Sequence, residues 1–192
     1  MPRRDNSGRR RLPTQSRRTI LVYCGAVRTE PDYLDGLRRK FRTSGVTVKV
    51  RQDGTAPDAL VRAAAAYERR HPGVFDEVWC VVDVDEFDLD AALVEARRRR
   101  VHLAVSNPCF ELWLLLHYAE CRAYCAGYPD VVRRLKKHLP AYDKTRLDFR
   151  HYAAGVADAV KRAKDLDPSG TAYHRNPSTS MWQLVEKIQE PV

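Results

Sequence analysis

The sequence predicts an α/β domain with a mostly parallel, four-stranded sheet flanked by helices, followed by a C-terminal helical extension. Between residues 19 and 107, short apolar runs alternate with amphipathic helical segments, the pattern of repeated strand–helix units in a parallel sheet. From Cys109 onward the pattern changes to helices. We therefore divide the chain into a disordered basic arm (1–18), an α/β core (19–118) and a helical extension packed on the core (119–192).

The elements of the core are expected in the following order. They are a strand at 19–24, a helix that begins after an N-cap at Thr29 and ends at Gly45, a strand at 46–50, a helix at 57–70, a strand at 78–82, a helix at 88–100 and a strand at 102–105. The run at 78–82 is unbroken, as in a central strand that is covered on both faces, whereas 46–50 alternates and is expected nearer the sheet edge.

The extension is expected to begin with a buried helix, because residues 110–116 are apolar nearly all round except for Glu111, which requires a partner or a function. Further helices are predicted at 131–138, 152–164 and 180–189.

Composition narrows the class of protein. No apolar run approaches the ~20 residues of a membrane-spanning helix. The N-terminus is polar and arginine-rich, which argues against a secretory signal. Five scattered cysteines are typical of reduced thiols rather than of a disulfide scaffold, so we expect a cytoplasmic protein.

The net charge of +9 is concentrated in the arm. Residues 1–18 contain seven arginines against one aspartate, a net charge of +6, which leaves +3 for residues 19–192. Such an arm binds nucleic acid through counterion release, without reading its sequence. A disordered solubilising tail explains the same composition equally well.

Four acidic residues follow the central strand within six positions, namely Asp83, Asp85, Glu86 and Asp88. Because side chains alternate along a strand, Asp83 and Asp85 project to the same side. Two neighbouring carboxylates repel unless a cation lies between them, and Mg²⁺ (or Mn²⁺) takes one or two carboxylates together with substrate phosphate. The pair therefore predicts a metal site at the carboxyl edge of the sheet, with a solvated acidic turn as the alternative.

Two further groups have both a functional and a structural interpretation. His174 and Arg175 either hold a phosphate or belong to a polar loop ahead of a helix. His117, Cys121 and Cys125 are spaced by four, which on a helix gives a stripe of three zinc ligands, but buried thiols beside an ordinary histidine are favoured. No Ser-His-Asp order, Walker loop or G-x-G-x-x-G motif is present.

Four stretches of the sequence resemble the RloB family, which is associated with prokaryotic restriction and abortive-infection loci. They are CGAVRTEPDYL (24–34), VVDVDEFD (81–88), SNPCFELWLLLHY (106–118) and NPST (176–179), in the family's order. The resemblance implies a Toprim-like fold, akin to the nuclease domains of OLD-type proteins. In such domains a glutamate after the first strand and a D-x-D after the third form a Mg²⁺ site.

The D-x-D corresponds to Asp83-Val84-Asp85, but the early glutamates are replaced. Family members commonly read C-E-G-E-x-T-E-P, whereas Gly25 and Val27 stand at the first two glutamate positions here and only Glu30 is kept. Either Glu30 serves as the metal-binding glutamate, or Glu111 substitutes for it, or the site is impaired.

The resemblance implies a Mg²⁺-dependent nuclease, acting on DNA or RNA in antiphage defence. The catalytic and metal-binding residues would be Glu30, Asp83, Asp85 and Glu111, and the substrate-binding residues would be Arg28, Asn107, His174 and Arg175. The alternative is a catalytically weak sensor subunit that binds nucleic acid or an ATPase, since RloB-like genes often neighbour ATPases. OLD-type relatives also make a homodimer an expectation.

Overall fold

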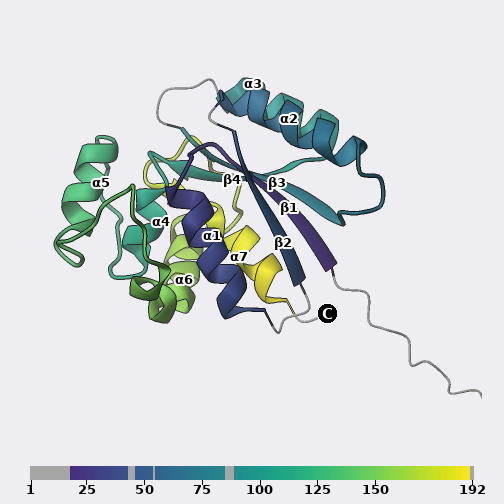
Figure 1. Cartoon of the computed structure of the whole chain (residues 1–192). Helices are drawn as coiled ribbons and strands as arrows, with labels where there is room; N and C mark the ends of the chain where they lie inside the picture. Colours follow the sequence, from purple (N-terminus) through teal and green to yellow (C-terminus); the bar gives the residue numbers. More distant parts are fainter. Residues whose placement is uncertain (1–17, 43–45, 54, 85–88, 191–192) are drawn as a thin grey trace, which may run out of the picture.

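The computed structural model describes residues 18–42, 46–53, 55–84 and 89–190, which form an α/β fold around one mostly parallel sheet (Figure 1). The strands are β1 (Arg18–Cys24), β2 (Val46–Gln52), β3 (Glu77–Asp83), β4 (His102–Asn107) and β5 (Ser178–Thr179). The α-helices are α1 (Thr29–Lys40), α2 (Pro57–Arg69), α3 (Leu89–Arg99), α4 (Glu111–Leu116), α5 (Tyr128–Leu135), α6 (Val156–Leu166) and α7 (Met181–Gln189). Two short 3₁₀ helices, Phe149–His151 and Ala153–Gly155, precede α6. The predicted fold class is confirmed.

The sheet has the strand order β2-β1-β3-β4-β5. Strands β1 to β4 are mutually parallel, as predicted, and β2 lies at an edge, as its alternating pattern indicated. The structure adds β5, which runs antiparallel to β4 and pairs only with Ser106 and Asn107. The four-stranded sheet predicted from the sequence lacks this strand, because two residues are too few to show a strand period.

Helices cover both faces of the sheet (Figure 1). Ile20 and Val22 of β1 face a core shared with α1, α4, α6 and α7, while Leu21 and Tyr23 face a second core shared with α2 and α3. This division follows from the alternation of side chains along a strand. All the helices that follow β4 therefore pack on the α1 side of the sheet or beside it.

The end of α4 removes the predicted stripe of zinc ligands. This helix stops at Leu116, so His117, Cys121 and Cys125 do not share a helical face. Nε2 of His117 lies 3.0 Å from the Tyr33 hydroxyl, and the two buried cysteines face each other with their sulfur atoms 3.5 Å apart. The favoured interpretation, buried thiols beside an ordinary histidine, agrees with this arrangement.

Two expectations near the N-terminus need correction. Strand β1 begins at Arg18, which pairs with Glu77 and with Glu190; the rest of the predicted basic arm lies outside the described residues. Thr29 is the first residue of α1 rather than its N-cap, and its hydroxyl donates to the Lys144 carbonyl at 2.9 Å. Within the described ranges, no helix is long and apolar enough to cross a membrane.

Candidate functional site

Acidic residues that follow or end three adjacent strands of the sheet lie at its carboxyl edge. Glu30 is in the first turn of α1, after β1; Asp83 is the last residue of β3; and Glu111 is the first residue of α4, after β4. Strands β1, β3 and β4 are parallel neighbours, so their carboxyl ends meet at one edge. The fold thereby brings together residues that are 28 to 81 positions apart in the chain.

Glu30 is a deeply buried carboxyl group of the site, and its pKa is raised. It is only 3% exposed, and burial, opposed by hydrogen bonds from its own backbone N–H and that of Ala26, raises its pKa from 4.5 to about 7. The nearby negative charge of Glu111 also raises this pKa. Oε2 of Glu30 is buried and has no hydrogen-bond partner among the described residues. An orphaned carboxylate oxygen beside a second carboxylate is a position that a cation would satisfy.

Glu111, which required a partner, accepts a 2.8 Å hydrogen bond from the Tyr142 hydroxyl. Burial, and then the charge of Glu111, raises the pKa of Tyr142, so this hydroxyl stays protonated and acts as a donor. No described lysine or arginine pairs with Glu30 or Glu111. The negative charge of the two buried glutamates is thus not compensated by a neighbouring cation of the described chain.

Asp83 and Glu111 are linked through Cys109. Burial raises the pKa of the Cys109 thiol, and the charges of Glu111 and Asp83 raise it further, so both carboxylates lie within electrostatic range of one sulfur atom. Asp83 is half-buried and stands opposite Ser106 in the β3–β4 ladder, which continues as Val84 donates to the Ser106 carbonyl at 3.1 Å. Asp85, the second residue of the predicted D-x-D, lies outside the described residues.

The fit of a divalent cation can be tested against these residues. Across the described ranges, no group of three or more His, Cys, Asp or Glu side chains is arranged to hold a metal ion. Nevertheless, the donors are carboxylate oxygens, the ligand type that Mg²⁺ and Mn²⁺ prefer, and one of them is the orphaned oxygen of Glu30. The donor chemistry therefore suits a hard cation, which would have to draw the carboxylates together or be completed by substrate oxygens.

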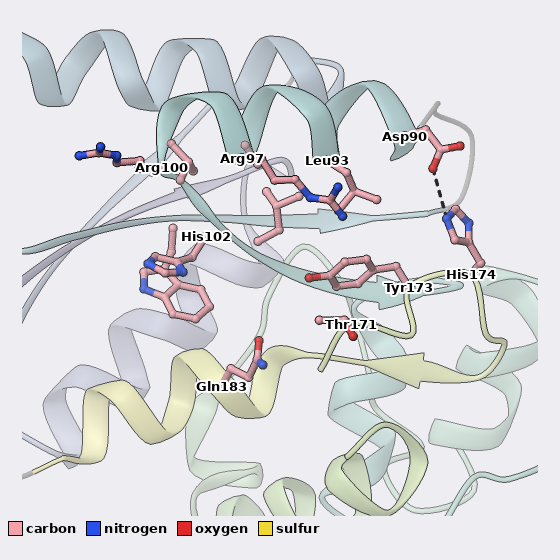
Figure 2. A pocket seen from close by; sticks show the side chains of 13 residues that line it. Asp90, Leu93, Arg97, Arg100, His102, Thr171, Tyr173, His174 and Gln183 are labelled. Carbon is pink, nitrogen blue, oxygen red and sulfur yellow. Dashed lines mark ion pairs between the residues drawn. The ribbon is translucent and has the colours of Figure 1, made fainter. Parts of the chain in front are cut away.

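Of the predicted substrate-binding residues, Asn107 and His174 lie near a pocket. Asn107 ends β4, and its amide donates to the Tyr173 carbonyl at 2.9 Å. Next to Tyr173, His174 lies at the mouth of a pocket, 3.2 Å from Asp90 (Figure 2).

The two predicted arginines instead contact backbone carbonyls. Nη1 of Arg28 approaches the Thr145 carbonyl at 3.5 Å, and Nη1 of Arg175 donates to the Leu166 carbonyl at 2.8 Å. Leu166 is the last residue of α6, so Arg175 places a cation at the negative end of that helix. This contact gives Arg175 a structural role in the described fold.

Sequence reasoning missed the tyrosine that fixes Glu111. Tyr142 is 31 positions away in a segment without helical or strand periodicity, so no local signal pairs the two residues. Cys109 was noted from the sequence only as part of the SNPCFEL stretch. Nothing in that stretch indicates that the Cys109 thiol lies near the carboxylates of Glu111 and Asp83.

Comparison with known protein families identifies the chain's relatives. The family model described as RloB-like protein matches residues 20–188, which includes every described residue of the acidic edge. No curated protein and no solved structure matches the chain significantly.

Proposed function

The chain belongs to the RloB-like protein family, and from this premise we propose that it is a metal-dependent nuclease that hydrolyses phosphodiester bonds of DNA or RNA in prokaryotic antiphage defence. The observation that carries the proposal is the gathering of Glu30, Asp83 and Glu111 at the carboxyl edge of a parallel sheet. Buried carboxylates without a compensating cation are costly to keep, and a buried carboxyl group with a raised pKa, such as Glu30, is a feature of functional sites. A Toprim-like origin of the fold is part of the same proposal.

The proposal gives each acidic residue a task. Asp83 and Glu30, with Asp85, would hold Mg²⁺ or Mn²⁺, which on binding polarises the scissile phosphate and stabilises charge on the leaving oxygen. Glu30 has a pKa of about 7 in the metal-free fold, so it would give up its proton as the cation binds. Glu111 is oriented by the hydrogen bond from Tyr142 and would hold a carboxylate oxygen in a fixed position beside the reacting phosphate. The basic arm would raise the local concentration of substrate.

Metal binding is expected to release protons near neutral pH, because a cation must displace the proton that Glu30 holds below a pKa of about 7. Affinity for Mg²⁺ or Mn²⁺ should therefore rise between pH 6 and pH 8. Calorimetric titration in two buffers of different ionisation enthalpy measures the proton release, and labelled single- and double-stranded DNA and RNA report cleavage, with EDTA as the control. A protein that cleaves none of these substrates with either metal would contradict the nuclease proposal.

Restoring a family glutamate at Gly25 is expected to strengthen the site. Gly25 follows β1, and its N–H donates to the Val81 carbonyl at 3.2 Å. A Cβ at this position would meet only that carbonyl oxygen, at an ordinary contact distance of 3.6 Å, so a side chain fits. Gly25→Glu should raise Mg²⁺ affinity by about tenfold, equivalent to ~1.4 kcal/mol, by adding a carboxylate to the acidic edge.

The matched control is Gly25→Gln, which adds nearly the same volume without the charge. Equal metal affinity in the two variants would show that a carboxylate at this position does not reach the cation. The measurement is the same calorimetric titration, with a thermal melt to confirm that both variants fold.

A second candidate function is a catalytically weak subunit that binds nucleic acid, a partner ATPase or a second copy of the chain. It is favoured by Gly25 and Val27, which stand where the family commonly carries glutamate, and by the lack of a preformed three-ligand group in the described ranges. It predicts binding that survives EDTA, with no cleavage under any metal. The cleavage assay above separates the two functions.

A further inference from the structure

A pocket separate from the acidic edge lies along the open edge of β4 (Figure 2). We name it the β4-edge groove and define it by Arg97, Arg100, His102, Leu103, Tyr173 and His174. Its volume is about 690 Å³, within the usual range of ligand pockets. It runs beneath α3, from the Asp90–His174 pair at its mouth to Arg100 and His102 at its far end (Figure 2).

The sheet is left open here because β5 is short. Ser106 directs its carbonyl toward β3, where it accepts from Val84, so the backbone groups of Val105 and Leu103 point to the other side of the strand. Ser180 satisfies those of Val105 with two contacts of 2.8 Å. Since β5 reaches only Ser106 and Asn107, Leu103 presents an N–H donor and a C=O acceptor to the groove.

The groove carries two arginine charges that have no carboxylate partner among the described residues, against the one carboxylate of Asp90 at its mouth. Arg99 pairs with Glu95 at 2.5 Å and Arg98 approaches the same carboxylate at 3.9 Å, whereas Arg97 and Arg100 form no ion pair with a described residue. Arg97 reaches from α3 toward Tyr173 (Figure 2). Its charge lowers the pKa of Tyr173, against the dominant raising effect of burial.

Arg100 keeps its position at a conformational cost. It follows the last turn of α3 with φ of 58°, in the left-handed region that glycine ordinarily occupies after a helix. An arginine that pairs with no carboxylate of the described chain, at a site where glycine would be less strained, points to a role for its charge rather than to a contribution to the fold.

Flat rings accompany the charges. His102 stacks on Trp79, with ring centroids 4.8 Å apart and an interplanar angle of 24°. His102 is exposed and lines the groove. Burial, and then the nearby Lys187 cation, lowers the pKa of His102, so at neutral pH its ring is largely an uncharged stacking surface. Cations that track a backbone beside rings that accept bases are the features by which proteins bind single-stranded nucleic acid.

We propose that the β4-edge groove binds a single strand of nucleic acid, with phosphates on Arg97 and Arg100, bases on His102 and Tyr173, and a base edge at the Leu103 backbone. The hydrogen bond between Asn107 and Tyr173 connects the mouth of the groove to the carboxyl edge of β4, so a bound strand is directed toward the acidic residues. A recess beneath a helix admits individual nucleotides and excludes a duplex. The inference rests on the proposed function in one respect, that nucleic acid is the substrate.

The test is binding of fluorescein-labelled single-stranded DNA and RNA by the full chain in EDTA, followed by fluorescence anisotropy over a range of salt concentrations. The double variant Arg97→Gln/Arg100→Gln should bind about tenfold more weakly near physiological salt, and the steepness of log affinity against log salt should fall by about 1.4, or ~0.7 for each phosphate contact to a single strand. The matched control, Arg98→Gln/Arg69→Gln, removes two exposed arginines outside the groove and should change affinity less than twofold. Equal losses in both double variants would overturn the proposal, as would wild-type protein that binds no oligonucleotide.

Two further measurements sharpen the result. Arg100→Gly should weaken binding while leaving the melting temperature unchanged or higher, because glycine relieves the left-handed conformation; weaker binding with a lower melting temperature would indicate a structural role instead. A polyglutamate competitor should displace the oligonucleotide poorly, and equal competition would replace the nucleic-acid proposal with a general polyanion site. If the groove variants lose binding but no metal supports cleavage, the groove stands and the nuclease proposal fails.

Discussion

Replacing Asp83 by asparagine is expected to abolish cleavage while leaving the fold intact. The carboxylate closes β3 at the acidic edge, is half-buried, and acts electrostatically on Cys109 together with Glu111. Asparagine has the same shape but no charge, so the backbone ladder to Ser106 is kept while a hard cation loses an anionic ligand. The cleavage rate should fall at least about 100-fold, since even the loss of residues that only support a metal ligand costs 10–100-fold.

The measurement is the initial rate of cleavage at saturating Mg²⁺, with a thermal melt on the same samples. Asp165→Asn is the matched control, because Asp165 is a surface carboxylate of α6 that pairs with Lys161 at 3.4 Å. It should retain wild-type activity. Full activity in Asp83→Asn would sink the assignment of this residue to the metal, whatever the result for the control.

The framework of the acidic edge could be predicted because it depends on local patterns. An unbroken apolar run at 78–82 requires cover on both faces, and the alternating run at 46–50 is typical of an edge strand; the structure places them at the centre and the edge of the sheet. Once the strand at 78–82 and the following strand, β4, are parallel neighbours, Asp83 and Glu111 must lie at the same end of the sheet.

The details of the site depend on contacts between distant segments, which the sequence does not encode locally. Nothing near Glu111 indicates that Tyr142 donates to it, and nothing near Glu30 shows that its carboxyl is 3% exposed. The antiparallel strand β5 likewise depends on a distant contact, because its two residues pair with Ser106 and Asn107 of β4. The unpaired part of the β4 edge is defined only once the position of β5 is known.

In the absence of metal, Glu30→Gln is expected to stabilise the protein at pH 8 and to have little effect at pH 4. In the unfolded chain this carboxyl has its usual pKa of 4.5, and burial raises it to about 7 in the fold. Between these values the folded state binds more protons than the unfolded state, so stability falls as the pH rises from 4.5 to 7 and the penalty is complete above 7. The difference corresponds to about 3 kcal/mol, which the uncharged glutamine does not incur.

Urea unfolding at pH 4 and pH 8 in EDTA measures this difference, with Glu120→Gln as the control because Glu120 is an exposed surface carboxylate. A stability difference between wild type and Glu30→Gln that is equal at the two pH values would contradict a buried carboxyl with a raised pKa. Adding Mg²⁺ at pH 8 should then narrow the gap by stabilising wild type and not the variant, because a cation bound to the folded state compensates the charge that glutamine lacks. The ionised carboxylate of Glu30 would thus lower the stability of the metal-free fold and, for the same reason, favour binding of the metal.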